Sequence, residues 1–431
     1  MPMVAAMADY PLWHPFADMG SVARERLTLV RGEGNYVWDD AGTKYLDGSA
    51  ALWYANLGHG RPEIARAVSE QLSTLDAYMT FGDYANEPSL RLAERLSALA
   101  PTPGSKVIFG SGGGDAVDTA VKVARRSFAE QGQPGRLHVI SREHGYHGTH
   151  GIGTAIAGIP SNTAGFGPMM ADTSVVAWDD ASALEAEIER IGADRVAAFV
   201  CEPVIGAGGV FPPVEGYIEA VAEICARHGV LFIADCVIGG FGRLGTWFGI
   251  DRWDVQPDLI CLAKGITGGT LPLGAVLVAP HVAAPFFSDE PGAPVFRHGP
   301  TYAGHPTVCA AGLAALDIYE AEELIPRGRA LEGVLHDALT PLADDGLIGA
   351  VRGGTGLLAA AELSADVLAA NPGALMAWQR GVREQGVLVR AMARGLAASP
   401  PLTVSEDELG RIGEAMVAGL AAVRSRVGAV A

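Results

Sequence analysis

Residues 230–235 read Val-Leu-Phe-Ile-Ala-Asp, and residues 257–265 read Pro-Asp-Leu-Ile-Cys-Leu-Ala-Lys-Gly. Neither stretch alternates between apolar and polar residues, which is typical of strands buried on both faces of a parallel sheet. Asp235 stands at the end of the first strand and Lys264 at the end of the second. Because open α/β sheets bind ligands at the carboxyl ends of their strands, we expect these two side chains to mark a functional site.

Similar apolar runs recur along the chain, and helical patterns separate several of them. The runs predict strands at 107–109, 137–140, 196–200, 230–234, 259–262 and 275–279, and the helical patterns cover 115–128, 181–191 and 216–227. Strands that alternate with helices predict an α/β fold with a mainly parallel sheet. The run 271–279 is an expected exception, because only a short loop separates it from the strand before it.

The two ends of the chain differ from this central part. Short strands are predicted at 27–30, 36–38 and 44–46, and the C-terminal part mixes helices with strand regions at 347–361 and 386–390. We therefore predict a large α/β domain over residues 61–321 and a smaller α+β domain built from residues 1–60 plus 322–431.

Composition excludes several classes of protein. Of the 431 residues, 49% are hydrophobic and 19% are charged, which excludes a disordered chain, and a net charge of −18 disfavours nucleic acid and anionic membranes as partners. Five scattered cysteines without a CxxC spacing predict small core residues in a reducing compartment. The N-terminus lacks a signal-peptide pattern, and no apolar stretch reaches about 18 residues, so we expect a cytoplasmic protein with no membrane partner.

The types of the two strand-end residues suggest covalent chemistry. Lysines are rarely buried unless they are paired or used, and a desolvated Lys264 amine could attack a carbonyl to form a Schiff base. The alternative is a lysine that extends to the surface. An aspartate such as Asp235 can keep the ring nitrogen of pyridoxal phosphate protonated, although a helix cap or a salt bridge would explain it equally well.

Three further features are candidates for binding. Residues 107–116 read as a strand, a Gly-rich turn and a helix start, whose free N–H groups suit a phosphate, although a plain tight turn has the same pattern. Four histidines lie between 138 and 150 without the HExxH spacing of a metal site, and Tyr146 among them suits stacking on a flat ring. Arg390, closing the predicted strand 386–390, suits a carboxylate ligand or a surface ion pair.

Five blocks together resemble the class III aminotransferases, fold-type-I pyridoxal phosphate enzymes that include the ω-amine:pyruvate transaminases. They are GSGGGDAVDTAVKVAR (110–125), EHGYHGTH (143–150), FIADCVIGGFGRLG (232–245), PDLICLAKGITGGTLPLGAVLV (257–278) and HGPTYAGHP (298–306). The resemblance, which runs from about Trp13 to Leu402, implies pyridoxal 5′-phosphate as cofactor. It also implies transfer of an amino group from an ω-amine or amino acid to an α-keto acid such as pyruvate, or to an aldehyde or ketone. A homodimer with shared active sites, or a dimer of such dimers, is a further implication.

The resemblance also implies roles around the cofactor ring. Lys264 is similar to the Schiff-base lysine that shuttles the proton, and Asp235 to the partner of the ring nitrogen. Val237 and Tyr146 resemble the residues packed on the two faces of the ring. Glu202 resembles a carboxylate near Asp235.

Other implied roles concern the phosphate and the substrate. Gly113 and Gly114 match the phosphate turn, and Thr301 resembles a phosphate ligand donated across a dimer interface. Trp53 matches an aromatic residue of the substrate pocket. Arg390 matches a mobile arginine that binds the carboxylate of the keto acid.

The sequence departs from the family pattern at several positions. Residues 112–114 are all glycine where the family usually has Ser-Gly-Ser, so a phosphate would lose a hydroxyl donor and depend more on backbone N–H groups. Asp115 and Cys236 each replace a common glutamate, and Ile238 stands where the γ-aminobutyrate and ornithine branch often has glutamine, which favours the ω-amine:pyruvate branch. The alternatives are a same-fold aminomutase, racemase or decarboxylase, a non-enzymatic binding protein, and a metal hydrolase built on the histidines.

Overall fold

The computed structural model describes residues 10–289 and 291–427. Residues 1–9, part of the N-terminal segment that lacks a signal-peptide pattern, lie outside the described residues. The central sheet has the order β4-β10-β9-β8-β7-β5-β6. Its strands are β4 (Lys106–Gly110), β5 (His138–Arg142), β6 (Thr173–Val176), β7 (Val196–Cys201), β8 (Leu231–Asp235), β9 (Leu259–Leu262) and β10 (Gly274–Val278).

The expected exception to parallel pairing is confirmed. Strand β10 runs antiparallel to both β4 and β9, while the remaining pairs are parallel. Strand β6 has no counterpart among the predicted strands. It lies at the edge of the sheet and only Val176 is buried, so it lacks the continuous apolar run that identifies the central strands.

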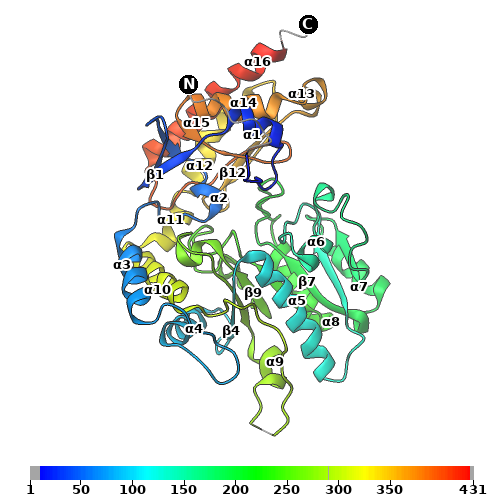
Figure 1. Ribbon diagram of the computed structural model, residues 1–431. Helices are drawn as coiled ribbons and strands as arrows, with labels where there is room; N and C mark the ends of the chain where they lie inside the picture. Colours follow the sequence, from blue (N-terminus) through cyan, green and yellow to red (C-terminus); the bar gives the residue numbers. More distant parts are fainter. Residues whose placement is uncertain (1–9, 290, 428–431) are drawn as a thin grey trace.

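Helices cover both faces of this sheet, as the apolar strands require (Figure 1). In β9, Leu259 and Cys261 join the core under α5 (Gly113–Glu130), while Ile260 and Leu262 join the core on the opposite face. That opposite core includes the apolar side of α8 (Tyr217–His228) and two residues of α7 (Ala181–Ile191). The alternation therefore buries every residue of the central strands β7 to β10.

Three helices pack together beside the sheet, namely α3 (Pro62–Thr74), α4 (Glu87–Leu99) and α10 (Pro306–Ala321). The shorter elements are α1 (Met19–Glu25), α2 (Ala50–Trp53), α6 (Gly151–Ala155), α9 (Pro280–Ala283), η2 (Pro160–Asn162), η3 (Ala193–Arg195), η4 (Ile250–Arg252), η5 (Lys264–Thr267) and η6 (Ala284–Phe286). No helix within the described part of the chain is long and apolar enough to cross a membrane.

The N-terminal and C-terminal parts of the chain meet in one small sheet. Its order is β1 (Leu29–Glu33), β2 (Tyr36–Asp39), β3 (Lys44–Asp47) and β13 (Val387–Leu388), with β13 parallel to β3. A second sheet has the order β11 (Ile348–Arg352), β12 (Ala359–Leu363), β15 (Gly395–Ala398) and β14 (Arg390–Ala391). The helices around them are α11 (Leu324–Ala330), α12 (Glu332–Leu339), η7 (Thr340–Asp344), α13 (Ala365–Ala370), α14 (Ala374–Glu384), α15 (Glu406–Gly419) and α16 (Ala421–Val427). The division at residues 60/61 and 321/322 stays a prediction.

The predicted single strand 386–390 is wrong, because the chain changes sheets within it. Leu388 belongs to the sheet of β3, whereas Arg390 begins a strand that pairs with β15. Val389, between them, is buried, and its carbonyl accepts a hydrogen bond from the Gln379 side chain at 3.0 Å. Arg390 therefore opens one strand instead of closing another.

The five cysteines are all buried and unpaired, as predicted for small core residues. Two lie in the central strands, Cys201 in β7 and Cys261 in β9. Burial raises the pKa of the Cys201 thiol to about 11, so this side chain stays protonated and inert.

Close packing of α11 onto the loop after β8 gives a test of the fold. A Cβ added at Gly328 would collide with the carbonyl oxygen of Gly242, a backbone atom that has no room to move. We expect Gly328→Ala to destabilise the protein by about 1–3 kcal/mol, seen as a lower midpoint of thermal unfolding. Gly333→Ala in the neighbouring helix α12 is the control, since nothing lies within 4 Å of the added carbon. An equal effect of both substitutions would contradict this packing.

Candidate active site

A cavity of about 440 Å³ opens at the carboxyl edge of the central sheet. The segments after the parallel strands line it, namely residues 111–114 after β4, 146–150 after β5, Glu202 after β7, Asp235, Val237 and Ile238 at β8, and Ala263 and Lys264 after β9. Residues 269–273 before β10 and Tyr54 complete the lining. The antiparallel β10 contributes its beginning because that end lies at the same edge of the sheet.

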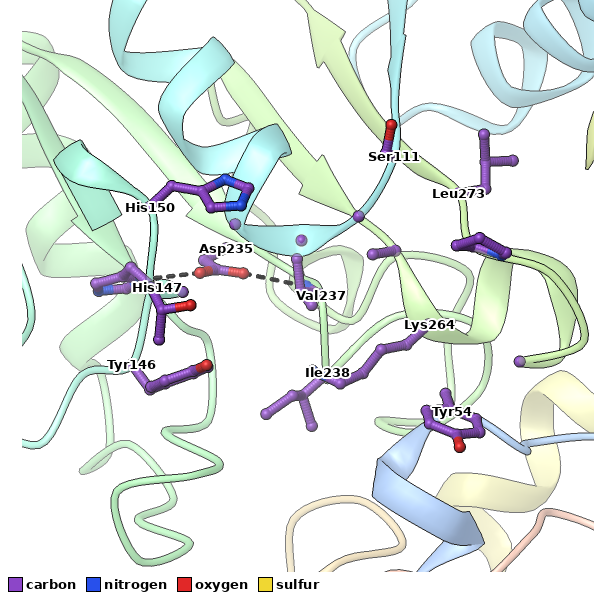
Figure 2. Close-up of a pocket in the computed structure, with 18 of the residues that line it drawn as sticks. Tyr54, Ser111, Tyr146, His147, His150, Asp235, Val237, Ile238, Lys264 and Leu273 are labelled. Carbon is purple, nitrogen blue, oxygen red and sulfur yellow. Dashed lines mark hydrogen bonds and ion pairs between the residues drawn. The ribbon is translucent and has the colours of Figure 1, made fainter. Parts of the chain in front are cut away.

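Lys264 lies directly after β9 and reaches across the cavity toward Ile238 (Figure 2). Its backbone has φ 53°, a conformation that non-glycine residues rarely adopt and that is concentrated at functional sites. Burial lowers the pKa of the Lys264 ammonium, and the nearby carboxylates of Asp235 and Glu202 partly oppose this. The amine is therefore neutral at a lower pH than an exposed lysine would be, which is the form that attacks carbonyl carbon.

Asp235 is fixed by two hydrogen bonds at the end of β8. Its Oδ2 lies 2.8 Å from Nδ1 of His147, and its Oδ1 accepts from the backbone N–H of Val237 at 3.2 Å. Both side chains of the His147–Asp235 pair are almost completely buried. Figure 2 shows both interactions on one side of the cavity. These two hydrogen bonds fix the orientation of the Asp235 carboxylate relative to the cavity.

Glu202 is a second buried acid in the same cavity. Its two oxygens accept from the backbone N–H groups of Tyr146 and Gly206, each at 2.9 Å. Burial raises the pKa of Glu202, and the neighbouring Asp235 adds to this shift while His147 opposes it. The bond to Tyr146 also fixes the backbone from which the Tyr146 ring enters the cavity.

The Gly-rich turn fits a phosphate group. Helix α5 begins at Gly113, and its first N–H groups face the cavity at the end where residues 111–114 line it. A Cβ at Gly113 would lie 2.7 Å from Cγ1 of Val237, and one at Gly148 would lie 2.6 Å from Cα of Gly114. Val237 and Gly114 therefore leave no room for side chains at Gly113 and Gly148. The backbone N–H groups of Gly113 and Gly114 remain as hydrogen-bond donors for a phosphate at the start of the helix.

The structure brings seven of the sequence-predicted site residues together in the lining: Gly113, Gly114, Tyr146, Glu202, Asp235, Val237 and Lys264. Trp53 is buried in a core with Ile238 and Leu244, and its neighbour Tyr54 lines the cavity instead. Thr301 is exposed in a turn and does not line the cavity of the single chain. Arg390 lies outside the lining but near Tyr146, whose pKa burial raises and Arg390 partly lowers.

Sequence reasoning missed His147 and His150 as parts of this site, because the four histidines were considered together. The structure gives each a different environment: His138 bonds the Ser174 hydroxyl, His144 stacks on Phe211, His147 pairs with Asp235, and His150 lies beside the Gly-rich turn. Within residues 10–289 and 291–427, no three His, Cys, Asp or Glu side chains form a group suited to a metal ion. The position of His147 directly after Tyr146, a predicted site residue, is the sequence signal that would have placed His147 near the cofactor site.

A Gly-rich helix start suited to a phosphate, a strand-end aspartate and a desolvated lysine on one mainly parallel sheet are the features of a pyridoxal-phosphate-dependent enzyme of fold type I. The class III aminotransferase family matches residues 19–420, and this chain belongs to that family. It is an aminotransferase whose cofactor is pyridoxal 5′-phosphate.

Individual relatives agree with this assignment. The chain is 35% identical to γ-aminobutyrate transaminase 3 of Solanum lycopersicum, over 92% of this chain and 80% of that protein. It is 34% identical to the ω-aminotransferase of Caulobacter vibrioides, over 93% and 95% of the two chains. Among solved structures, an amine transaminase of an uncultivated Pseudomonas species, with pyridoxal phosphate bound, superposes with a TM-score of 0.91 at 37% identity over 96% and 99% of the chains.

The lowered pKa of Lys264 predicts how the cofactor-free protein takes up pyridoxal phosphate as pH is varied. The rate of covalent attachment should reach half its maximum at a pH below the ordinary pKa of lysine, because the lowered pKa leaves the amine neutral there. Asp235→Asn should move this midpoint lower still, since it removes a negative charge that stabilises the ammonium. Stopped-flow absorbance would measure both rates. A midpoint at or above the ordinary pKa of lysine would contradict the lowered pKa of Lys264.

Proposed function

We propose that this aminotransferase takes the amino group from an ω-amine, a primary amine at the end of an apolar chain, and passes it to pyruvate or a similar small α-keto acid. One observation carries the proposal. Of the described residues lining the cavity, Lys264 is the only lysine or arginine. Apart from Lys264, the described lining therefore offers a donor's carboxylate no lysine and no arginine, while Ile238 and residues 271–273 offer apolar contact.

The acceptor needs a cation that is not permanently in the cavity. Arg390 meets this requirement, because it begins β14 outside the lining and its charge influences Tyr146, which does line the cavity. We propose that Arg390 pairs with the carboxylate of the keto acid and is not used by a simple amine. The resemblance to the ω-aminotransferase of Caulobacter vibrioides supports the same substrate class.

Each residue of the site would then have a defined task. Pyridoxal phosphate supplies an aldehyde for attachment to amines and a protonated ring that accepts an electron pair. Lys264, once its amine is free, would take the proton from the substrate carbon that bears nitrogen and return it to the carbon on the cofactor side. Asp235, held by His147, would keep the ring nitrogen protonated. Val237 and Tyr146 would contact the two faces of the ring.

We also propose a homodimer in which Thr301 serves the neighbouring subunit's phosphate site. Thr301 is exposed, and its turn lies against the segment 78–84, since the Thr80 hydroxyl donates to the carbonyl of Ala303 at 2.9 Å. Exposed aromatic side chains gather on these two segments, namely Tyr78, Phe81, Tyr84 and Tyr302. An apolar patch of this kind supports a protein interface.

Amino transfer is tested directly by the visible absorption of the purified protein with its cofactor. The yellow colour of the bound cofactor should fade when an ω-amine is added and return when pyruvate follows. Lys264→Ala should abolish turnover with every donor, because no other lysine lines the cavity. A decarboxylase, racemase or aminomutase would convert the donor without needing pyruvate. Faster turnover of γ-aminobutyrate than of a matched simple amine would contradict the proposed donor class.

Replacement of Arg390 separates the two halves of the reaction. Arg390→Ala should raise the KM for pyruvate by about tenfold or more, because it removes a charge-assisted hydrogen bond to the carboxylate. The KM for a simple amine should change far less, since that donor carries no carboxylate. Arg394→Ala, on the same segment but paired with Glu362, is the control. Equal losses with amine and keto acid would show that Arg390 does not select the acceptor.

A further inference from the structure

The His150 ring lies beside Gly114, next to the place where a serine side chain at residue 114 would begin. A Cβ added at Gly114 would lie 3.4 Å from Nδ1 of His150 and 3.6 Å from its Cγ. These are ordinary contact distances, so the ring stands next to the missing side chain without overlapping it. Figure 2 shows the imidazole beside the first turn of α5, facing the cavity.

The His150 side chain is exposed, and its ring has no hydrogen bond or ion pair to any part of the described chain. At the turn, the ring lies against Gly114. Gly112 to Gly114 offer only backbone N–H groups, although Ser111 before them and Thr149 beside His150 also line the cavity. The Asp115 carboxylate at the turn accepts from the backbone N–H of Ser111 at 2.8 Å. An imidazole N–H is a donor that suits a phosphate oxygen.

We propose that His150 is a phosphate-binding residue of the cofactor site, which supplies the side-chain donor that the all-glycine turn lacks. The inference depends on the phosphate position proposed for the turn. An imidazole at residue 150, in the segment after β5, and a hydroxyl at residue 114, in the first turn of α5, would reach the same place. His150 also borders a second cavity of about 870 Å³, lined by Phe16, Phe166 and Met170 among others, so a role in packing is the competing explanation.

The test compares two ligands that differ only in the phosphate. The equilibrium dissociation constants of pyridoxal 5′-phosphate and of pyridoxal are measured by dialysis against the cofactor-free protein. In His150→Ala and in His150→Phe, which keeps an aromatic ring but has no donor, the constant for pyridoxal phosphate should rise about tenfold or more, and that for pyridoxal should stay within about twofold. His281→Ala, at an exposed histidine paired with Asp258, is the control.

A second variant tests whether the donor itself is what matters. Gly114→Ser added to His150→Ala should restore most of the affinity for pyridoxal phosphate, because the position tolerates a Cβ. Gly113→Ser should not, since its Cβ would meet Val237.

The outcomes separate the inference from the proposal on which it depends. If the wild-type protein binds pyridoxal and pyridoxal phosphate equally well, the phosphate site at the turn is wrong. If the wild type prefers pyridoxal phosphate and both His150 variants keep that preference, the site stands and the role of His150 is overturned. Equal weakening of both ligands would assign His150 to packing.

Discussion

Desolvation of three ionisable side chains in one cavity is the constraint on which this active site depends. Asp235 and Glu202 are buried and Lys264 is half-buried at the carboxyl edge of the sheet, where each charged form loses hydration. Burial lowers the pKa of Lys264 and raises that of Glu202, so both groups are moved toward their neutral forms. Asp235 is held in place by His147 and a backbone N–H. One buried environment thus favours a neutral amine beside a firmly oriented acid.

Backbone geometry makes this crowding feasible. Lys264 leaves β9 in a left-handed conformation, which turns its side chain back across the sheet edge. On the opposite side, Gly148 has φ 95° and lies against Gly114, so the loop after β5 contacts the start of α5 without any side chain between them.

The central fold could be predicted from the sequence because its strands are buried on both faces. The predicted strand 259–262 and helix 181–191 coincide with β9 and α7, since continuous apolar runs and a regular helical period leave little ambiguity. The edge strand β6 and the change of sheet at Val389 were not predictable in this way. Both depend on which backbone groups find partners, and the side-chain pattern does not encode that choice.

The candidate site was predictable to the extent that its residues follow strands. For Trp53 and Tyr54 the sequence was not sufficient, because Tyr54 lines the cavity in place of the expected Trp53. Ala50, Ala51 and Trp53 all have positive φ, so the segment follows neither a helical nor a strand period, and no pattern tells which aromatic side chain faces the cavity. The pairing of His147 with Asp235 joins the loop after β5 to the end of β8, 88 residues further along the chain, and a single sequence carries no signal for that contact.

The contact between residues 113 and 237 limits how this enzyme can be redesigned or can diverge. Because a Cβ at Gly113 would lie 2.7 Å from Val237, any larger residue at 113 requires a smaller one at 237, the position proposed to pack on the ring. A side chain can therefore be added at 113 only if the residue at 237 becomes smaller, so a change on the phosphate side alters the ring face as well. Libraries that vary position 113 alone would sample mostly inactive proteins, whereas coupled replacements at 113 and 237 open a route to different cofactor tilts.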